Sequence, residues 1–68
     1  MEIYTGTIKL YKPENGYGFI KLKNSREVFF HIKEVKSNEE NIAVGKEVTF
    51  EIGESKKGPI AKNVEITP

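Results

Sequence analysis

The chain has 68 residues, which is enough for one small domain spanning residues 1–68. It contains no cysteine and a single histidine, which excludes a disulfide framework and argues against a metal site built from protein ligands. Eleven Lys and Arg against ten Asp and Glu give a formal net charge of +1, which is not typical of a strong binder of duplex DNA. No basic region followed by an apolar run opens the chain, and no stretch approaches the roughly 20 apolar residues of a membrane helix. We therefore expect a cytoplasmic protein that has no membrane partner.

Residues 3–11 are rich in β-branched and aromatic side chains and predict the first strand. Gly6 within this strand indicates a bend or a close approach of another backbone. Strict alternation would leave both faces of the strand ending in an apolar residue, so we expect a bulge near Lys9. The Asn15-Gly16 pair that follows predicts a hairpin turn.

Residues 17–23 and 27–32 predict the second and third strands, separated by a short polar turn. One face of each strand is apolar, as a core face should be, and Phe30 belongs to it. The opposite faces should be polar in a small antiparallel sheet, yet they carry four rings: Tyr17, Phe19, Phe29 and His31. A domain of this size buries only about 60% of its unfolded surface, so little material is left to cover these rings. We expect them to face solvent and to have a function.

Residues 33–46 are polar with isolated apolar side chains. We expect a helical turn near residues 33–36 and then a long mobile loop that ends at Gly45. A loop of this length in so small a domain is often functional or disordered.

Residues 47–52 alternate cleanly and predict the fourth strand, and residues 60–66 predict the fifth after a turn-rich loop at 53–59. In the fourth strand we expect Val48 and Phe50 to point inward. Five short strands without a clear helix predict an all-β fold, a five-stranded antiparallel barrel of the oligonucleotide-binding (OB-fold) type. An SH3-like barrel is the alternative.

Several segments together resemble one known family. Residues 15–20, N-G-Y-G-F-I, are similar to the first ribonucleoprotein motif of cold-shock domains, and residues 28–32, V-F-F-H-I, are similar to the second. Residues 5–9, 44–51 and 58–64 resemble the remaining strands of that family, in order and with matching gaps. The chain thus resembles a bacterial-type cold-shock protein. The resemblance implies an OB-fold barrel that binds single-stranded RNA and DNA, is not an enzyme, and needs no cofactor or small-molecule substrate.

The resemblance also implies a set of binding positions. Exposed rings let bases stack at about 1–3 kcal/mol each, and cations at the rim of the site contact phosphates, which makes binding salt-dependent. By position, the expected nucleic-acid-binding residues are Lys9, Leu10, Tyr11, Tyr17, Phe19, Phe29, His31, Ile32 and Lys57. For Tyr11 the pattern leaves two alternatives, the edge of the core or the binding face.

The chain departs from the family pattern at several of these positions. Leu10 stands where the family usually has tryptophan, Ile32 where phenylalanine ends the second motif, and Asn15 where lysine starts the first. Glu39 and Glu40 lie in the loop that usually carries another aromatic residue. If each of three missing rings is worth about 1 kcal/mol, the loss is about 3 kcal/mol, or roughly a hundredfold in affinity. We therefore expect binding that is retained but weaker than is typical of the family.

The expected function is binding of single-stranded nucleic acid, as an RNA chaperone or a regulator of transcription or translation. The alternative is a protein-interaction or self-association module built on the same barrel. A catalytic role for His31 is disfavoured because the chain contains no aspartate and no recognisable nucleophile motif. We expect a monomer, although the long loop would permit a strand-exchanged dimer.

Overall fold

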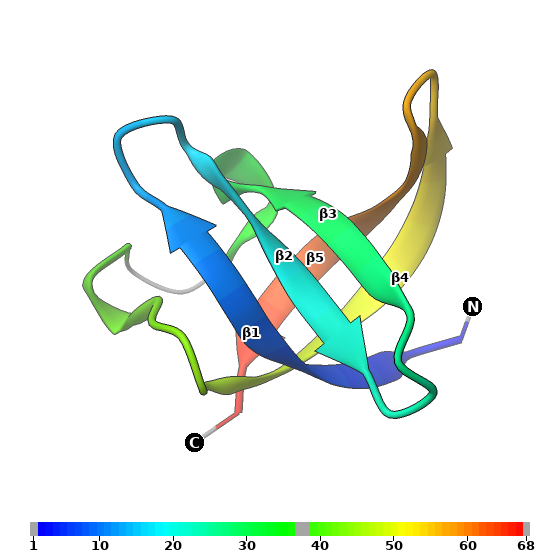
Figure 1. Ribbon diagram of the computed structural model, residues 1–68, viewed down its shortest axis with the longest axis horizontal. Helices are drawn as coiled ribbons and strands as arrows, with labels where there is room; N and C mark the ends of the chain where they lie inside the picture. The colour runs from blue at the N-terminus through cyan, green and yellow to red at the C-terminus, as the bar shows by residue number, and fades with distance from the viewer. Residues whose placement is uncertain (1, 37–38, 68) are drawn as a thin grey trace.

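The computed structural model describes residues 2–36 and 39–67. Over these residues the predicted all-β fold is confirmed (Figure 1). The elements are β1 (Tyr4–Lys12), β2 (Tyr17–Leu22), β3 (Glu27–His31), the 3₁₀ helices η1 (Ile32–Glu34) and η2 (Glu39–Asn41), β4 (Glu47–Ser55) and β5 (Gly58–Ile66). None of the helices formed by these residues is long and apolar enough to cross a membrane.

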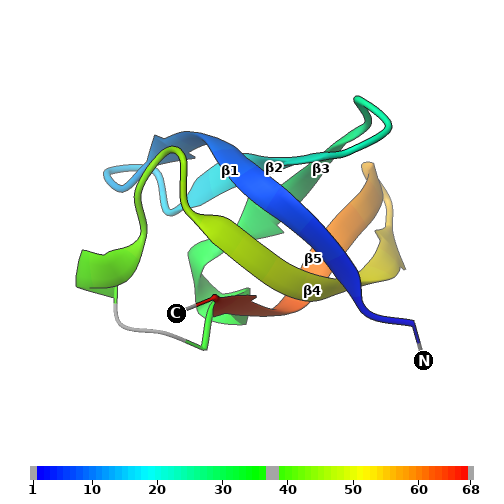
Figure 2. The same ribbon diagram turned by 90° about the horizontal axis from the view of Figure 1, so that it is seen from below.

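The strands form a closed barrel in the order β1-β2-β3-β5-β4, with β1 paired to β4 (Figures 1 and 2). This is the expected OB-fold barrel and not the SH3-like alternative. One pair of strands differs from the expected antiparallel arrangement, because β3 and β5 run parallel. In this pair Phe29 lies opposite Ile60, and Phe30 lies opposite Ala61. Parallel neighbours need a long crossover connection, and the segment from η1 to β4 supplies it.

Among the described residues, ten apolar side chains form the buried core, and they include Phe30, Val48 and Phe50, which the sequence predicted to point inward. They are Ile8, Ile20, Leu22, Val28, Phe30, Ile42, Val48, Phe50, Ala61 and Val64. Gly6 shows the predicted close approach of another backbone, since a Cβ there would lie 2.8 Å from the Lys21 carbonyl oxygen.

The bulge expected in β1 is present at Lys9. Ile8 faces Ile20 and Leu10 faces Phe19, so Lys9 is the extra residue between two consecutive pairs. One additional residue reverses the side-chain phase of the strand. Ile8 is buried before the bulge, whereas Leu10, two residues further on, is exposed.

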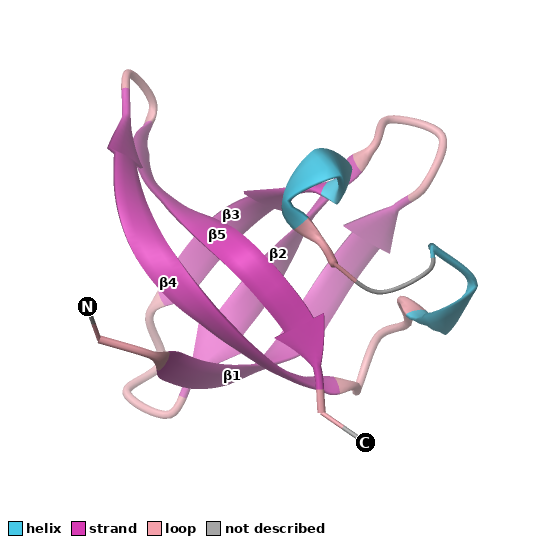
Figure 3. Ribbon diagram, turned by 180° about the vertical axis from the view of Figure 1, so that it is seen from behind, coloured by secondary structure: helices cyan, strands magenta, loops and turns pink. Residues whose placement is uncertain are grey.

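The described residues between β3 and β4 contain more regular structure than the loop we expected. The predicted helical turn appears as η1, one residue earlier than predicted. Val35 forms a parallel bridge with Val64, and the Lys36 N–H donates to the Val64 carbonyl oxygen at 2.8 Å. Beyond residues 37–38, which lie outside the described residues, η2 precedes the buried Ile42 (Figure 3). The segment is therefore anchored to the core at Val35 and Ile42.

Candidate nucleic-acid interface

Strands β2 and β3 bring the four predicted rings onto one outward surface. Tyr17 lies opposite His31, and Phe19 lies opposite Phe29 in the antiparallel register. The side chains of Tyr17, Phe19 and Phe29 are half-buried, and that of His31 is exposed. We call these four residues, Tyr17, Phe19, Phe29 and His31, the ring surface.

Three rings of the ring surface pack against one another. The Tyr17 and Phe29 centroids are 5.3 Å apart with 29° between the planes. Phe19 meets Phe29 edge to face at 5.8 Å and 77°, and it meets Tyr17 at 6.3 Å and 90°. Offset and edge-to-face contacts are the arrangements that aromatic rings prefer. The rings therefore hold one another in place, which reduces the entropy lost when a flat ligand stacks on them.

His31 has a structural role that its sequence pattern did not reveal. It is the N-cap residue of η1, and its Nδ1 accepts a hydrogen bond from the Lys33 N–H at 3.1 Å. A neutral imidazole that accepts at Nδ1 carries its proton on Nε2. The cap thus orients the imidazole and makes Nε2 a hydrogen-bond donor.

The hairpin between β4 and β5 forms a wall beside the ring surface. Ser55 faces Gly58 at its tip, where the Ser55 hydroxyl donates to the Gly58 carbonyl oxygen at 2.7 Å and accepts from the Lys57 N–H at 3.3 Å. Both strands reach further than the predicted ends at residues 52 and 60, so the hairpin projects from the barrel (Figure 1).

A groove of about 520 Å³ runs between the ring surface and this hairpin. It is lined by Phe19, Phe29, His31, Ser55, Lys56, Lys57, Pro59 and Ile60. The predicted Lys57 therefore lies beside the rings, and Lys56 is a second cation that sequence reasoning missed. Pro59 and Ile60 were also missed as site residues, because only the parallel β3–β5 pairing places them next to Phe29.

Lys9, expected as a cation at the rim, already has a partner within the chain. Its Nζ lies 2.6 Å from Glu27 Oε2, and the two side chains are 53% and 42% exposed. The hydrogen bond and the charge of Lys9 hold the pKa of the Glu27 carboxyl below its ordinary value, and the nearby charge of Lys21 lowers it further. Any phosphate that binds Lys9 has to compete with this carboxylate.

Residues 4–67 match the family model described as the 'Cold-shock' DNA-binding domain. The chain belongs to the cold-shock domain family. This family consists of nucleic-acid-binding proteins and not of enzymes, so the chain is a nucleic-acid-binding protein.

Known cold-shock proteins and a solved structure agree with this assignment. The chain is 38% identical over 61 residues to the major cold shock protein CspA of Bacillus cereus, covering 88% of this chain and 91% of that one. It is 42% identical over 62 residues to the cold shock-like protein CspJ of Salmonella typhimurium, covering 88% and 89%. The structure of drosophila Unr CSD456 matches with a TM-score of 0.82 and 26% identity, over 98% of this chain and 27% of that chain.

Three further residues, which the resemblance to cold-shock domains predicts to bind nucleic acid, lie in different surroundings. Leu10 is 37% exposed and faces Phe19 in the register, which places it beside the ring surface. Tyr11 lies beyond the bulge on the core side, the first of its two expected alternatives, and packs with Phe30. Ile32 is also partly buried against the core, and its N–H donates to the Gly16 carbonyl oxygen at 2.9 Å. Of these three residues of the cold-shock domain, only Leu10 extends the ring surface.

Proposed function

We propose that this cold-shock domain binds single-stranded RNA and DNA in the cytoplasm with low sequence specificity, by stacking unpaired bases on the ring surface. The observation that supports the proposal is the pairing of Tyr17 with His31 and of Phe19 with Phe29 on an outward face. Every base has a π-face, so stacking tolerates many sequences at about 1–3 kcal/mol per base. Lys56 and Lys57 line the adjoining groove, where they can reach phosphates.

The test is a fluorescence titration with a short pyrimidine-rich single strand. Phe19→Ala and Phe29→Ala each remove one platform, and we expect each to weaken binding about 5- to 100-fold. Tyr4→Ala is the matched control, because Tyr4 is also half-buried but stacks on Phe50 at 6.1 Å, away from the ring surface. Affinity equal to the parent in both phenylalanine variants would overturn the proposal.

Binding of this kind supports a role as an RNA chaperone or as a regulator of transcription or translation. A protein that stacks unpaired bases stabilises the open form of an RNA hairpin relative to its paired form, by mass action. We expect the domain to lower the melting temperature of a short RNA hairpin carrying a fluorophore and a quencher, and Phe29→Ala to reduce this shift. A hairpin that melts at the same temperature with and without saturating protein would exclude the chaperone role.

We also propose that the domain acts as a monomer. Each of the five described strands is paired on both sides in the closed barrel, and a closed barrel has no free edge strand that invites a second copy. Sedimentation equilibrium over a range of concentrations should give the mass of one chain. A dimer that Phe19→Ala dissociates in the absence of nucleic acid would instead favour the self-association module.

A further inference from the structure

The outward face of β2 does not end with the rings. Tyr17 and Phe19 occupy its first half, Lys21 continues the same alternation, and Lys23 follows in the turn just after the strand ends at Leu22. Both lysines are exposed. Alternate residues of a strand lie about 6.6–6.8 Å apart on one face, so the two aromatic positions are followed at this spacing by one cation, Lys21, and the turn adds a second, Lys23.

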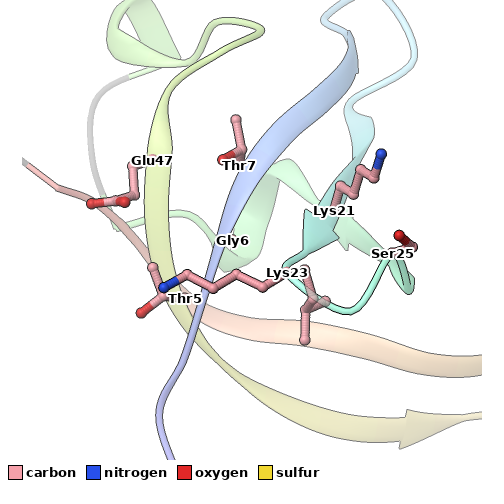
Figure 4. A pocket seen from close by; sticks show the side chains of 8 residues that line it. Thr5, Gly6, Thr7, Lys21, Lys23, Ser25 and Glu47 are labelled. Atoms are coloured by element: carbon pink, nitrogen blue, oxygen red, sulfur yellow. The ribbon is translucent and has the colours of Figure 1, made fainter.

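These lysines border a hollow on the barrel surface. The hollow has a volume of about 310 Å³ and is lined by Thr5, Gly6, Thr7, Lys21, Leu22, Lys23, Ser25 and Glu47 (Figure 4). β1 supplies the two threonines, and Thr7 faces Lys21 in the register. In Figure 4 the Lys23 side chain extends toward Thr5. We call this site the β1–β2 hollow.

The polar groups of the β1–β2 hollow are available to a ligand. Within residues 2–36 and 39–67, neither ammonium group and neither threonine hydroxyl has a hydrogen bond or an ion pair. Thr5, Thr7, Lys21 and Lys23 are all exposed. The hollow thus offers two cations and two hydroxyl donors that no other part of the described chain occupies.

The charge around the hollow is unequally distributed. Glu27 faces Lys21 in the register, but it is the carboxylate that already binds Lys9. Glu47 faces Thr7 from β4 and is the one carboxylate among the lining residues, on the side of β1 away from Lys21 (Figure 4). The Lys21 side of the hollow therefore favours an anion, and Glu47 limits the other side, where the Lys23 side chain extends toward Thr5 (Figure 4).

We propose that the β1–β2 hollow binds backbone phosphates of nucleotides that flank those stacked on the ring surface. This inference rests on the proposed function, because the same strand of nucleic acid would have to occupy both regions. Lysine together with threonine and serine hydroxyls is a typical set of phosphate contacts. The hollow contains no aromatic residue, so it adds affinity through charge and hydroxyl groups without stacking a base.

A polynucleotide suits the hollow better than a free phosphate does. The site is open and its lysines are exposed, so a small anion would exchange its hydration for few contacts. A nucleic acid already held by the rings places its next phosphates nearby at a high effective concentration. The hollow would thus extend the binding site along β2, and its contribution would depend on the length of the strand.

The test compares two oligothymidylates, of about four and about eight nucleotides, which span the lower range of OB-fold site sizes. Lys21→Gln combined with Lys23→Gln removes both charges and keeps the side-chain length. We expect this double variant to lose about threefold to tenfold in affinity for the longer strand and less than about twofold for the shorter one. The slope of log K against log salt with the longer strand should become shallower by about 1.4, or 0.7 per lost contact.

The matched control is Lys36→Gln combined with Lys62→Gln, which changes the net charge equally at two exposed positions outside the hollow. Equal losses of affinity in the two double variants would show that the effect comes from net charge alone, and this would overturn the proposal. Glu47→Gln should act in the opposite direction and raise affinity for the longer strand about twofold. The proposal would also be overturned if Glu47→Gln gave no gain and the Lys21/Lys23 double variant showed no loss that depends on strand length.

Nuclear magnetic resonance distinguishes binding of polynucleotide phosphates from binding of free inorganic phosphate. We expect the amide resonances of Thr5, Thr7 and Lys21 to shift with the longer oligothymidylate and not with inorganic phosphate at the same phosphate concentration. Equal shifts with both would identify a general anion site and overturn the assignment to a polynucleotide. Failure of Phe19→Ala to weaken the shorter strand would refute the ring surface itself, a result distinct from either outcome at the hollow.

Discussion

The rings of Tyr11 and Phe30 stack with their centroids 6.4 Å apart and 18° between their planes, with Gly18 between them in the sheet. Gly18 faces Tyr11 on β1 and Phe30 on β3. A Cβ at this position would lie 2.6 Å from Phe30 Cε1 and 2.3 Å from the Leu10 carbonyl oxygen. The core thus requires the glycine that separates Tyr17 from Phe19, whose rings point the other way.

Gly18→Ala is therefore expected to destabilise the fold. Backbone oxygen and a buried ring cannot move aside cheaply, so we expect a loss of about 2–4 kcal/mol in the free energy of unfolding. Gly53→Ala is the matched control, because the three atoms nearest to a Cβ there belong to the flexible Lys62 side chain, with Cε at 2.8 Å. Urea unfolding followed by circular dichroism measures both. Equal stability of the two variants would show that β1 can move away from Gly18.

The parts of the molecule that depend on local alternation could be predicted from the sequence. The ring surface followed from two strands whose outward faces carry aromatic residues, and the β1 bulge followed from a strand whose two faces both end in an apolar residue. These features follow from the two-residue period of a strand, which can be read from neighbouring residues. The core positions of Phe30 and Phe50 were predicted for the same reason.

The parts that depend on distant pairing could not be predicted. Nothing in the pattern near Ile60 shows that it pairs with Phe29 across the parallel β3–β5 contact, so the groove was only partly foreseen. Ile42 was an isolated apolar residue in a polar segment, without a period to indicate burial, yet it belongs to the core. The Lys9–Glu27 ion pair joins β1 to β3, and only the finished sheet brings these residues together.

Leu10→Trp should strengthen nucleic-acid binding. Leu10 is exposed beside Phe19, so an indole at this position would enlarge the ring surface. One additional stack is worth about 1–3 kcal/mol, which corresponds to about 5- to 100-fold in affinity. Titration of the new tryptophan fluorescence with oligothymidylate measures the change, and Leu10→Met, monitored by tyrosine fluorescence, controls for side-chain size without a ring. An affinity gain in the methionine variant as large as in the tryptophan variant would rule out stacking as its cause.

Glu27→Gln should also strengthen binding, by a different mechanism. The substitution removes the carboxylate that binds Lys9 at 2.6 Å and leaves the ammonium group available to a phosphate. We expect about a twofold to fivefold gain at low salt and a salt dependence that is steeper by about 0.7 in log–log slope. Glu65→Gln, an equal change of charge at an exposed position on β5, should have a smaller effect and leave the slope unchanged. A parallel gain in both variants would attribute the effect to net charge alone.

The same ion pair predicts how stability depends on pH. Lys9 lowers the pKa of Glu27 in the folded chain below its ordinary value of 4.5. The pair therefore stabilises the fold fully above pH 4.5, and this contribution is lost as the pH falls through the lowered pKa. The melting temperature of the parent should exceed that of Glu27→Gln at neutral pH, and the difference should shrink in acid. Because the other carboxylates are common to both proteins, their titration cancels in the difference. Lys9→Gln should remove most of the pH dependence of this difference and leave the smaller part due to the charge of Lys21. A pH dependence that is undiminished in that background would show that Lys9 is not the partner responsible.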